Sequence, residues 1–333
     1  MKKVIYLLLI VFCFACSSQN TEKERIYNSW DKEADVKDAV RELSLEEVMV
    51  HDNSSLYVNG DYILIVDHSS MDSQIFVIDK NDFHYAGSFA HKGGGPNEIT
   101  NIGDLAFNES QQLVYITDFG KQKILSCNID SVLMDSSYTF KEVASLEKSQ
   151  FPSEYTYIND TLCVGRFIFP IGNNNYRPQV AKWNMLTGEY KLMGYEHPGI
   201  ESKRMTCAVS AEKQLYAECY SNHDLLTIGD FDGNLKCNIY GPKWKESARG
   251  ANYYGKAVFR NNQIIVPYSG GSRKNDTYEP TKFHVFDIDG NYLKTLNIGY
   301  KIIRYCYDKD NDRLIMCFND EIQFGYLDLK DLI

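Results

Sequence analysis

The sequence lacks a hydrophobic run long enough to cross a bilayer as a helix. Its most apolar stretch, Val4–Ala15, has 12 residues, whereas a membrane-spanning helix needs about 20. Positive charge is also scarce, because 35 Lys and Arg stand against 45 Asp and Glu and the net charge is −10. Nucleic-acid binding depends on neutralising phosphates, so we expect no nucleic-acid partner. Since there is no polybasic segment either, contact with a membrane requires a lipid anchor.

Motifs typical of catalytic and metal sites are absent as well. None of the seven histidines belongs to an H-E-x-x-H pair, and neither G-x-S-x-G nor a phosphate-binding P-loop occurs. The seven cysteines beyond Cys16 are odd in number, irregularly spaced and mostly placed in apolar runs. This pattern indicates buried thiols rather than a disulfide framework. We therefore expect no cofactor and no metal.

The first residues, by contrast, form a recognisable pattern. Two lysines precede Val4–Ala15, the apolar run stops at Cys16, and a polar stretch follows. A positive start, a short apolar core and a small residue before a cysteine are typical of a bacterial lipoprotein signal. We predict a signal peptide over residues 1–15, lipidation of Cys16, and a polar tether over residues 16–38. The predicted location is the cell envelope at the outer membrane, with the choice between its periplasmic and surface faces left open.

Residues 39–333 consist of short alternating or β-branched runs without long helical periodicity. The runs come in pairs, and most of the second runs lead into a turn rich in Asp, Asn or Gly. Equivalent positions recur at steps of 46 to 57 residues, which is typical of a propeller blade. Six pairs predict an all-β fold, a six-bladed β-propeller with four-stranded antiparallel blades. The pairs are Tyr62–Asp67 with Gln74–Asp79, Leu113–Asp118 with Lys123–Asp130, Thr161–Phe169 with Gln179–Met185, Gln214–Tyr220 with Leu225–Phe231, Gln263–Ser269 with Phe283–Ile288, and Arg313–Phe318 with Glu321–Leu329.

The sixth unit runs out of chain after three strands. The segment Val40–Val50 precedes the first blade and is predicted to supply the missing outer strand. Joining the two ends of the chain in one blade would remove an open sheet edge from the ring.

A glycine-rich loop follows the first predicted blade. Residues His91–Glu98 read HKGGGPNE, and they resemble the G-x-G-P-G-E loop of TolB-like six-bladed β-propeller lipoproteins of gut-type Gram-negative bacteria, with Asn97 in place of the second family glycine. The lipoprotein signal followed by a polar tether is similar too, so the resemblance covers nearly the whole mature chain. It implies the propeller fold. Because that family is mostly of unassigned function, the resemblance implies little about chemistry.

Strand alternation predicts which long loops share a face of the ring. In a four-stranded antiparallel blade, the loop between the second and third strands lies on the same face as the connection to the next blade. Five long segments in this class contain ten Lys and Arg but six Asp and Glu, and aromatic side chains accompany them. Aromatic faces and Arg forks suit sugars or carboxylates. The segments are Ala90–Gly103, Arg166–Pro178, Tyr195–Arg204, Tyr240–Tyr254 and Ser269–Thr281, and the candidate ligand-binding residues are Arg166, Tyr176, Arg177, Trp244, Arg249, Tyr253, Tyr254, Arg273 and Tyr278.

These features favour a non-enzymatic binding or scaffold module at the envelope, recognising a protein or an anionic glycan or peptide. One alternative is a propeller hydrolase or lactonase with its site on the central axis, where sequence spacing reveals no pattern. Another is a purely structural partner in an outer-membrane complex. An axial cluster of Asp, Glu, Asn or His would favour the enzyme. An apolar axis with an aromatic and basic patch on one face would favour binding.

The signal pattern generates a direct test. Replacing the predicted lipidation site, Cys16→Ser, should move the protein out of the membrane fraction, because the hydroxyl cannot take the thioether-linked lipid. Fractionation and immunoblotting of cells expressing each form measure this. Unchanged membrane association of the variant would contradict lipidation at Cys16.

Overall fold

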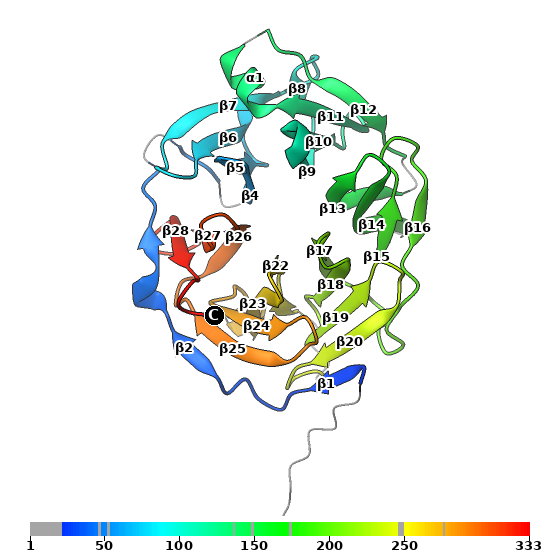
Figure 1. Cartoon of the computed structure of the whole chain (residues 1–333), viewed down its shortest axis with the longest axis vertical. Helices are drawn as coiled ribbons and strands as arrows, with labels where there is room; N and C mark the ends of the chain where they lie inside the picture. The colour runs from blue at the N-terminus through cyan, green and yellow to red at the C-terminus, as the bar shows by residue number, and fades with distance from the viewer. Residues whose placement is uncertain are drawn as a thin grey trace, which may run out of the picture.

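The computed structural model of the chain is a ring of six β-sheets around a central axis (Figure 1). It describes residues 22–333 except 46–47, 52–53, 136, 148–149, 173–174, 246–249 and 276. The predicted six-bladed, all-β propeller with four-stranded antiparallel blades is confirmed. The predicted signal peptide and Cys16 lie outside the described residues. No helix in the described part of the chain is long and apolar enough to cross a membrane.

Each blade is built from consecutive strands that run from the axis to the rim. Blade 1 contains β4 (Ser54–Asn59), β5 (Tyr62–Asp67), β6 (Ser73–Asp79), β7 (Tyr85–Lys92) and the short β8 (Glu98–Ile99). Blade 2 contains β9 (Ile102–Asn108), β10 (Leu113–Asp118), β11 (Lys123–Asn128) and β12 (Lys141–Ser145). Blade 3 contains β13 (Phe151–Asn159), β14 (Leu162–Gly172), β15 (Asn175–Trp183) and β16 (Tyr190–Leu192).

The second half of the ring repeats this arrangement. Blade 4 contains β17 (Met205–Ser210), β18 (Leu215–Tyr220), β19 (Leu225–Asp230) and β20 (Leu235–Tyr240). Blade 5 contains β21 (Ala251–Tyr254), β22 (Val258–Arg260), β23 (Gln263–Ser272), β24 (Lys282–Asp287) and β25 (Tyr292–Asn297). Blade 6 contains β26 (Ile302–Asp308), β27 (Arg313–Phe318) and β28 (Phe324–Asp328). The described helices are short: α1 (Ile129–Met134) and the 3-10 turns η1 (Lys37–Ala39), η2 (Glu109–Gln111) and η3 (Arg273–Asn275).

The six predicted pairs of runs are the second and third strands of the six blades. Neighbouring blades cover these strands on both faces, so their sequences are almost continuously apolar. Every residue of β18 and of β27 is buried. Between blades 1 and 2, for example, Leu64 and Ile75 pack in one cluster with Leu105 and Ile116. The hydrophobic core is therefore divided among the boundaries between blades.

The chain from residue 22 to residue 36, here called the N-terminal strap, differs from the predicted tether. Strand β1 (Glu24–Ile26) pairs in parallel with β20 at the rim of blade 4, and β2 (Glu33–Asp35) pairs in the same way with β25 of blade 5. Between them, Trp30 packs against His284, with ring centroids 4.7 Å apart. The aromatic residues of the strap are partly buried against the rim and its two strands join the sheets of blades 4 and 5, so propeller structure begins before the predicted boundary at residue 38.

The two ends of the chain meet in blade 6, as predicted. Strand β3 (Arg41–Glu42) pairs antiparallel with β28, and the Leu43 backbone N–H donates to the Phe324 carbonyl at 2.9 Å. The paired strand is shorter than the predicted Val40–Val50. The residues after it still contribute to closure, because Leu43 and Val48 are buried in a cluster shared by blades 6 and 1.

A buried charge network fastens blade 6 to blade 1. Asp308, fully buried at the end of β26, accepts a hydrogen bond from Arg313 Nε at 3.0 Å and lies 3.5 Å from Lys80 Nζ. Lys80 comes from the turn after β6 in blade 1. The Arg313 guanidinium also lies 4.9 Å from the ring centroid of Phe83, another blade 1 residue. Buried charges of this kind stabilise only when each has its partner.

Removing residues 1–50 should destabilise the ring, because it takes away β1, β2, β3 and several buried apolar side chains. At about 1.5–3 kcal/mol for each buried side chain, the melting temperature should fall by on the order of 10 °C or more. Thermal unfolding followed by circular dichroism measures this. A matched truncation of residues 1–21 leaves every described strand in place and should melt like the full mature chain. Equal stability of the two truncations would show that the N-terminal segment does not close the ring.

Replacing the buried carboxylate, Asp308→Asn, should cost about 3–5 kcal/mol, because it leaves the buried Arg313 without its counter-charge and leaves Lys80 with Asp310 as its one acidic partner among the described residues. The exposed neighbour supplies the control: Asp310→Asn should cost less than about 1 kcal/mol, since the Asp310 side chain is 58% exposed. Denaturant unfolding measures both. Equal losses would contradict the role assigned to Asp308.

The difference in stability between the wild type and Asp308→Asn should change with pH in a direction that the pKa of Asp308 determines. Burial opposes ionisation of Asp308, but the hydrogen bond from Asn311 and the charges of Lys80 and Arg313 overcome it and lower the pKa below the ordinary 3.8. A lowered pKa in the folded state stabilises the protein above the ordinary pKa, and this contribution disappears as the pH falls. The stability gap between the wild type and Asp308→Asn should therefore narrow below about pH 3.8.

Candidate ligand-binding cavity on the propeller axis

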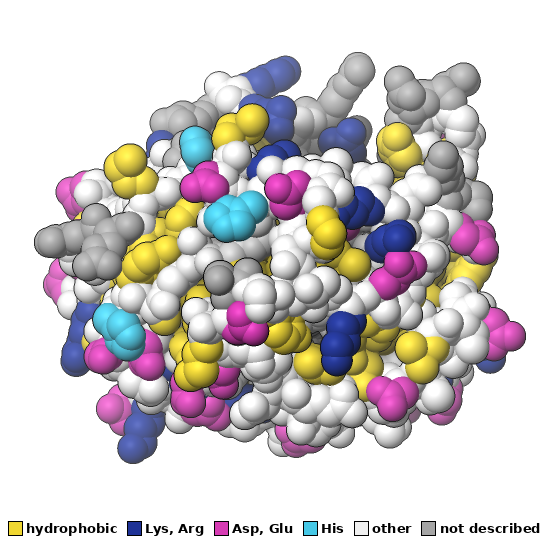
Figure 2. Space-filling model, turned by 90° about the horizontal axis from the view of Figure 1, so that it is seen from above, with side chains coloured by type: hydrophobic (Ala, Val, Ile, Leu, Met, Phe, Trp, Pro, Cys, Tyr) yellow, Lys and Arg dark blue, Asp and Glu magenta, His cyan; other side chains and the backbone are white. Residues whose placement is uncertain are grey.

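A cavity of about 660 Å³ surrounds the axis where the innermost strands begin. The connections from the preceding blades arrive on this face, so it is also the face of the long loops. All six blades contribute to the wall, and most of the contributed side chains are polar or charged. Seen from its edge, the ring carries Lys and Arg side chains along the upper rim of the view (Figure 2). The polar lining includes Ser55, Tyr57, His68, Asp104, Ser153, Glu154, Arg166, Thr206, Ser221, Asn252, Lys256, Tyr278, Glu279, Arg304 and Tyr305.

Backbone irregularities place charged residues at this cavity. Where the innermost strand of a blade begins, its pairing with the second strand shifts register in blades 2, 3 and 6. Such bulges re-aim side chains and are common beside functional sites. Asp104, Glu154 and Arg304 stand at these three shifts. In blade 5 the innermost strand is interrupted between β21 and β22, and Lys256 lies in the gap.

Glu154 carries a negative charge that several neighbouring groups in the wall stabilise. Its carboxylate lies 2.9 Å from Lys256 Nζ and 3.8 Å from Arg166 Nε, and it accepts a hydrogen bond from the Cys207 backbone N–H at 3.0 Å. Although burial opposes its charge, Lys256 and Arg166 lower the pKa of Glu154. A Cβ atom on Gly165 would lie 2.2 Å from the Glu154 carbonyl oxygen, so glycine is needed there for strands β13 and β14 to approach this closely.

Asp104 is a second acid in the wall, in a different situation. Its carboxylate accepts hydrogen bonds from the Tyr57 hydroxyl at 2.6 Å and from the Tyr155 backbone N–H at 3.0 Å. It forms no ion pair with any described residue. Burial raises the pKa of Asp104, and the negative charge of Glu154 adds to this increase, whereas the positive charge of Lys256 acts against it. The carboxyl groups of Asp104 and Glu154 therefore have pKa values displaced in opposite directions.

Arg304 and His68 face the cavity from blades 6 and 1. Arg304 is exposed and donates one hydrogen bond, to the Ile303 carbonyl at 2.8 Å, and among the described residues it has no acidic partner. His68 Nε2 lies 3.1 Å from the Ser55 hydroxyl. Burial and the charge of Arg304 lower the pKa of His68, whereas the charge of Asp104 acts in the opposite direction. The imidazole therefore lies within electrostatic reach of both unpaired charges.

Four of the predicted ligand-binding residues belong to this cavity or its edge. Arg166, Tyr254 and Tyr278 line it. The Arg273 guanidinium lies 4.7 Å from the ring centroid of Tyr278, which places it beside the lining. Arg166 does not present a free fork, because it donates to the Ser153 hydroxyl and to a backbone carbonyl in addition to facing Glu154.

The structure places the other predicted residues elsewhere. Tyr176 is exposed, and Arg177 forms an ion pair with Glu196, away from the residues that line the cavity. Trp244 packs at 5.0–5.8 Å against Tyr240, His197 and His223 of blade 4 and its connections. Tyr253 is 2% exposed. Arg249 lies outside the described residues.

Sequence reasoning missed several charged or titratable lining residues, and five of them have a common place in the fold. They share a position at the start of an innermost strand or just after a second strand, where the alternation of the strand is broken. A search restricted to long loops passes over such positions. The segment Tyr240–Tyr254 stops two residues short of one of them, so extending each loop into the following strand would have found it. These five residues are His68, Asp104, Glu154, Lys256 and Arg304.

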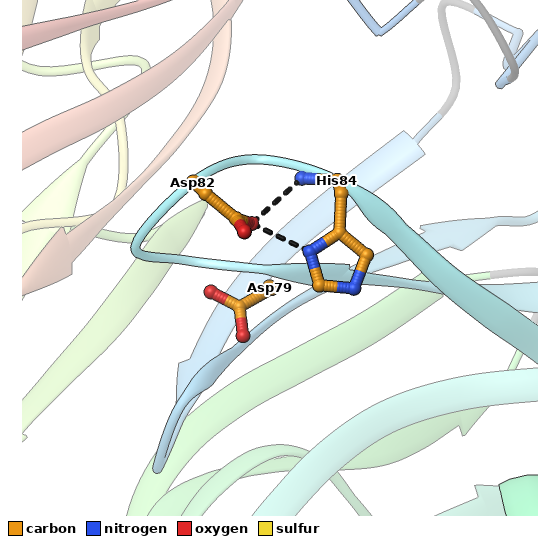
Figure 3. Close-up of side chains that lie close together, drawn as sticks. All are labelled: Asp79, Asp82 and His84. Atoms are coloured by element: carbon orange, nitrogen blue, oxygen red, sulfur yellow. Dashed lines mark hydrogen bonds and ion pairs between the residues drawn. The ribbon is translucent and has the colours of Figure 1, made fainter.

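One group of possible metal ligands lies away from the cavity. In the turn between β6 and β7, one ligand atom each of Asp79, Asp82 and His84 lie within 4.8 Å of one another (Figure 3). His84 Nδ1 is 2.5 Å from the Asp82 carboxylate, which also accepts the His84 backbone N–H. Asp79 accepts the backbone N–H of Asn81 at 2.7 Å. These hydrogen bonds account for the group as part of the turn.

Comparison with known proteins agrees with the fold. Residues 23–161 match the model of the family DUF5128, which is described as a 6-bladed beta-propeller. No curated protein matches the chain. A candidate exported protein from Bacteroides fragilis has a similar structure, with a TM-score of 0.53 and 9% identity over 92% of this chain and 99% of that one. A member of the DUF4221 family from Bacteroides vulgatus has a TM-score of 0.56 and 12% identity, over 86% and 94%.

Proposed function

We propose that the protein is an exported binding module, held at the cell envelope by a lipid on Cys16, which captures a carboxylate-bearing ligand in its axial cavity. The lipoprotein-type signal and the resemblance to TolB-like lipoproteins support the location. The name of the Bacteroides fragilis protein with a similar fold is consistent with export. The same residues of the cavity would bind a carboxylate whether a glycan or a peptide segment carries it.

The observation that carries this proposal is that Arg304 has no acidic partner among the described residues. A guanidinium offers five N–H donors in a planar fork that matches a carboxylate, and Arg304 uses one hydrogen bond to a neighbouring carbonyl. It lines a cavity whose volume lies within the range of small-molecule sites. Tyr278 with its stacked Arg273 adds an aromatic surface and a second cation beside the lining.

The wall also supports a second candidate function, a hydrolase. Two carboxyl groups whose pKa values are displaced in opposite directions are a common acid–base arrangement, and Asp104 and Glu154 fit that description. Glu154, however, is held by Lys256, Arg166 and the Cys207 backbone N–H. A carboxylate engaged on both oxygens is poorly placed to act as a base or nucleophile. Binding is therefore the function that the geometry favours.

The proposal is tested by calorimetric titration with two single-carboxylate probes, N-acetyl-L-alanyl-L-alanine and D-glucuronate, and with D-glucose as a neutral reference. We expect a carboxylate probe to bind. Arg304→Gln should weaken that binding by tenfold to a hundredfold, because a charge-assisted hydrogen bond contributes about 1.5–3 kcal/mol. Arg177→Gln, a change on the same face but outside the lining, is the matched control and should bind normally.

Failure of both carboxylate probes to bind, or equal affinity of the Arg304→Gln variant, would overturn the proposed site. Nuclear magnetic resonance spectra of the same mixtures distinguish the second candidate. Probe that is unchanged after prolonged incubation supports binding, whereas its conversion to products would favour the hydrolase.

A further inference from the structure

Side chains of both charges line the cavity without an ionic partner among the described residues. Arg304 comes from blade 6 and Asp104 from blade 2, on either side of blade 1. Glu154 is already balanced by Lys256 and Arg166. Glu279 accepts hydrogen bonds from the Asn319 amide. Glu279 forms no ion pair with a described residue either, so the charges of the wall that lack an ionic partner are one cation and two anions, rather than a surface of a single sign.

Each of these groups keeps bonding capacity for a ligand. Each carboxylate oxygen can accept two hydrogen bonds, and the described contacts of Asp104 are one to the Tyr57 hydroxyl and one to the Tyr155 N–H. Asp104 is partly exposed, so the cavity reaches it. A ligand ammonium would compensate a carboxylate that burial disfavours, and it would add charge-assisted hydrogen bonds. A sugar acid has a group for Arg304 but no cation for Asp104.

We propose that the ligand is a small zwitterion of the peptide type, whose free ammonium group binds Asp104 while its carboxylate binds Arg304. This inference rests on the proposed function and names the ligand class for the same cavity. A dipeptide has both groups, and the cavity volume of about 660 Å³ accommodates a ligand of this size.

Three probes that differ in one group each test the inference on the wild-type protein: L-alanyl-L-alanine, N-acetyl-L-alanyl-L-alanine and L-alanyl-L-alanine amide. Calorimetry should give the tightest binding for the free dipeptide. Loss of either charge should weaken binding by tenfold or more. This comparison needs no variant, so it stands even if a substitution in the wall disturbs folding.

Two variants then assign the groups. In the Asp104→Asn variant, the affinities for the free dipeptide and for its N-acetyl form should lie within about twofold of each other. In the Arg304→Gln variant, the amide should instead bind about as tightly as the free dipeptide. Glu279→Gln is the matched control and should keep both preferences. Loss of the ammonium preference in Glu279→Gln but not in Asp104→Asn would overturn the assignment of Asp104.

The outcomes separate this inference from the proposed function. If N-acetyl-L-alanyl-L-alanine binds as tightly as the free dipeptide and depends on Arg304, the zwitterion inference is wrong while the carboxylate site stands. If none of the three probes binds, the zwitterion inference is overturned. If D-glucuronate still binds through Arg304 in that case, the carboxylate site survives on its own.

Discussion

Closure of the ring is the constraint on which the rest of the structure depends. A sixth sheet that ended at β28 would leave an open strand edge, and β3 from the beginning of the chain covers it. The buried Asp308, with Arg313 and Lys80, then joins the last blade to the first. Because each blade packs mainly on its neighbours, fixing this one boundary fixes where all six innermost strands begin. The cavity exists only because those six starts converge.

Charge at the axis comes from departures from regular β-structure. A regular innermost strand would alternate side chains evenly between the two blade boundaries, and those boundaries are apolar. The register shifts beside Asp104, Glu154 and Arg304 break this alternation. Local rules are commonly broken where a protein functions, with the cost compensated elsewhere. Here the compensation is visible in the close approach at Gly165 and in the hydrogen bonds that hold Glu154.

The strands could be predicted from the sequence because the second and third strands of each blade are buried on both faces, so runs such as Tyr62–Asp67 have an unmistakable composition. The closing strand could be predicted because the last unit is one strand short. The strap could not, since its pairing in parallel with β20 and β25 spans over 200 residues and its composition is mostly polar. The reasoning from long loops predicted the face of the ring on which the cavity opens, and three of its lining residues, Arg166, Tyr254 and Tyr278. Lys256 and Arg304 depend on an interruption and a bulge that no spacing reports.

The position of the strap has a mechanical consequence for a lipid-anchored molecule. Strand β1 begins at Glu24, eight residues after Cys16, and eight residues extend to at most about 28 Å. A lipid on Cys16 would therefore be joined to the rim of blade 4 by a short segment, rather than to the axis by a long one. The ring could roll and tilt about that rim, but its edge would stay close to the headgroups. The mouth of the cavity would then sample the space alongside the bilayer, where ligands diffusing near the membrane surface would reach it first.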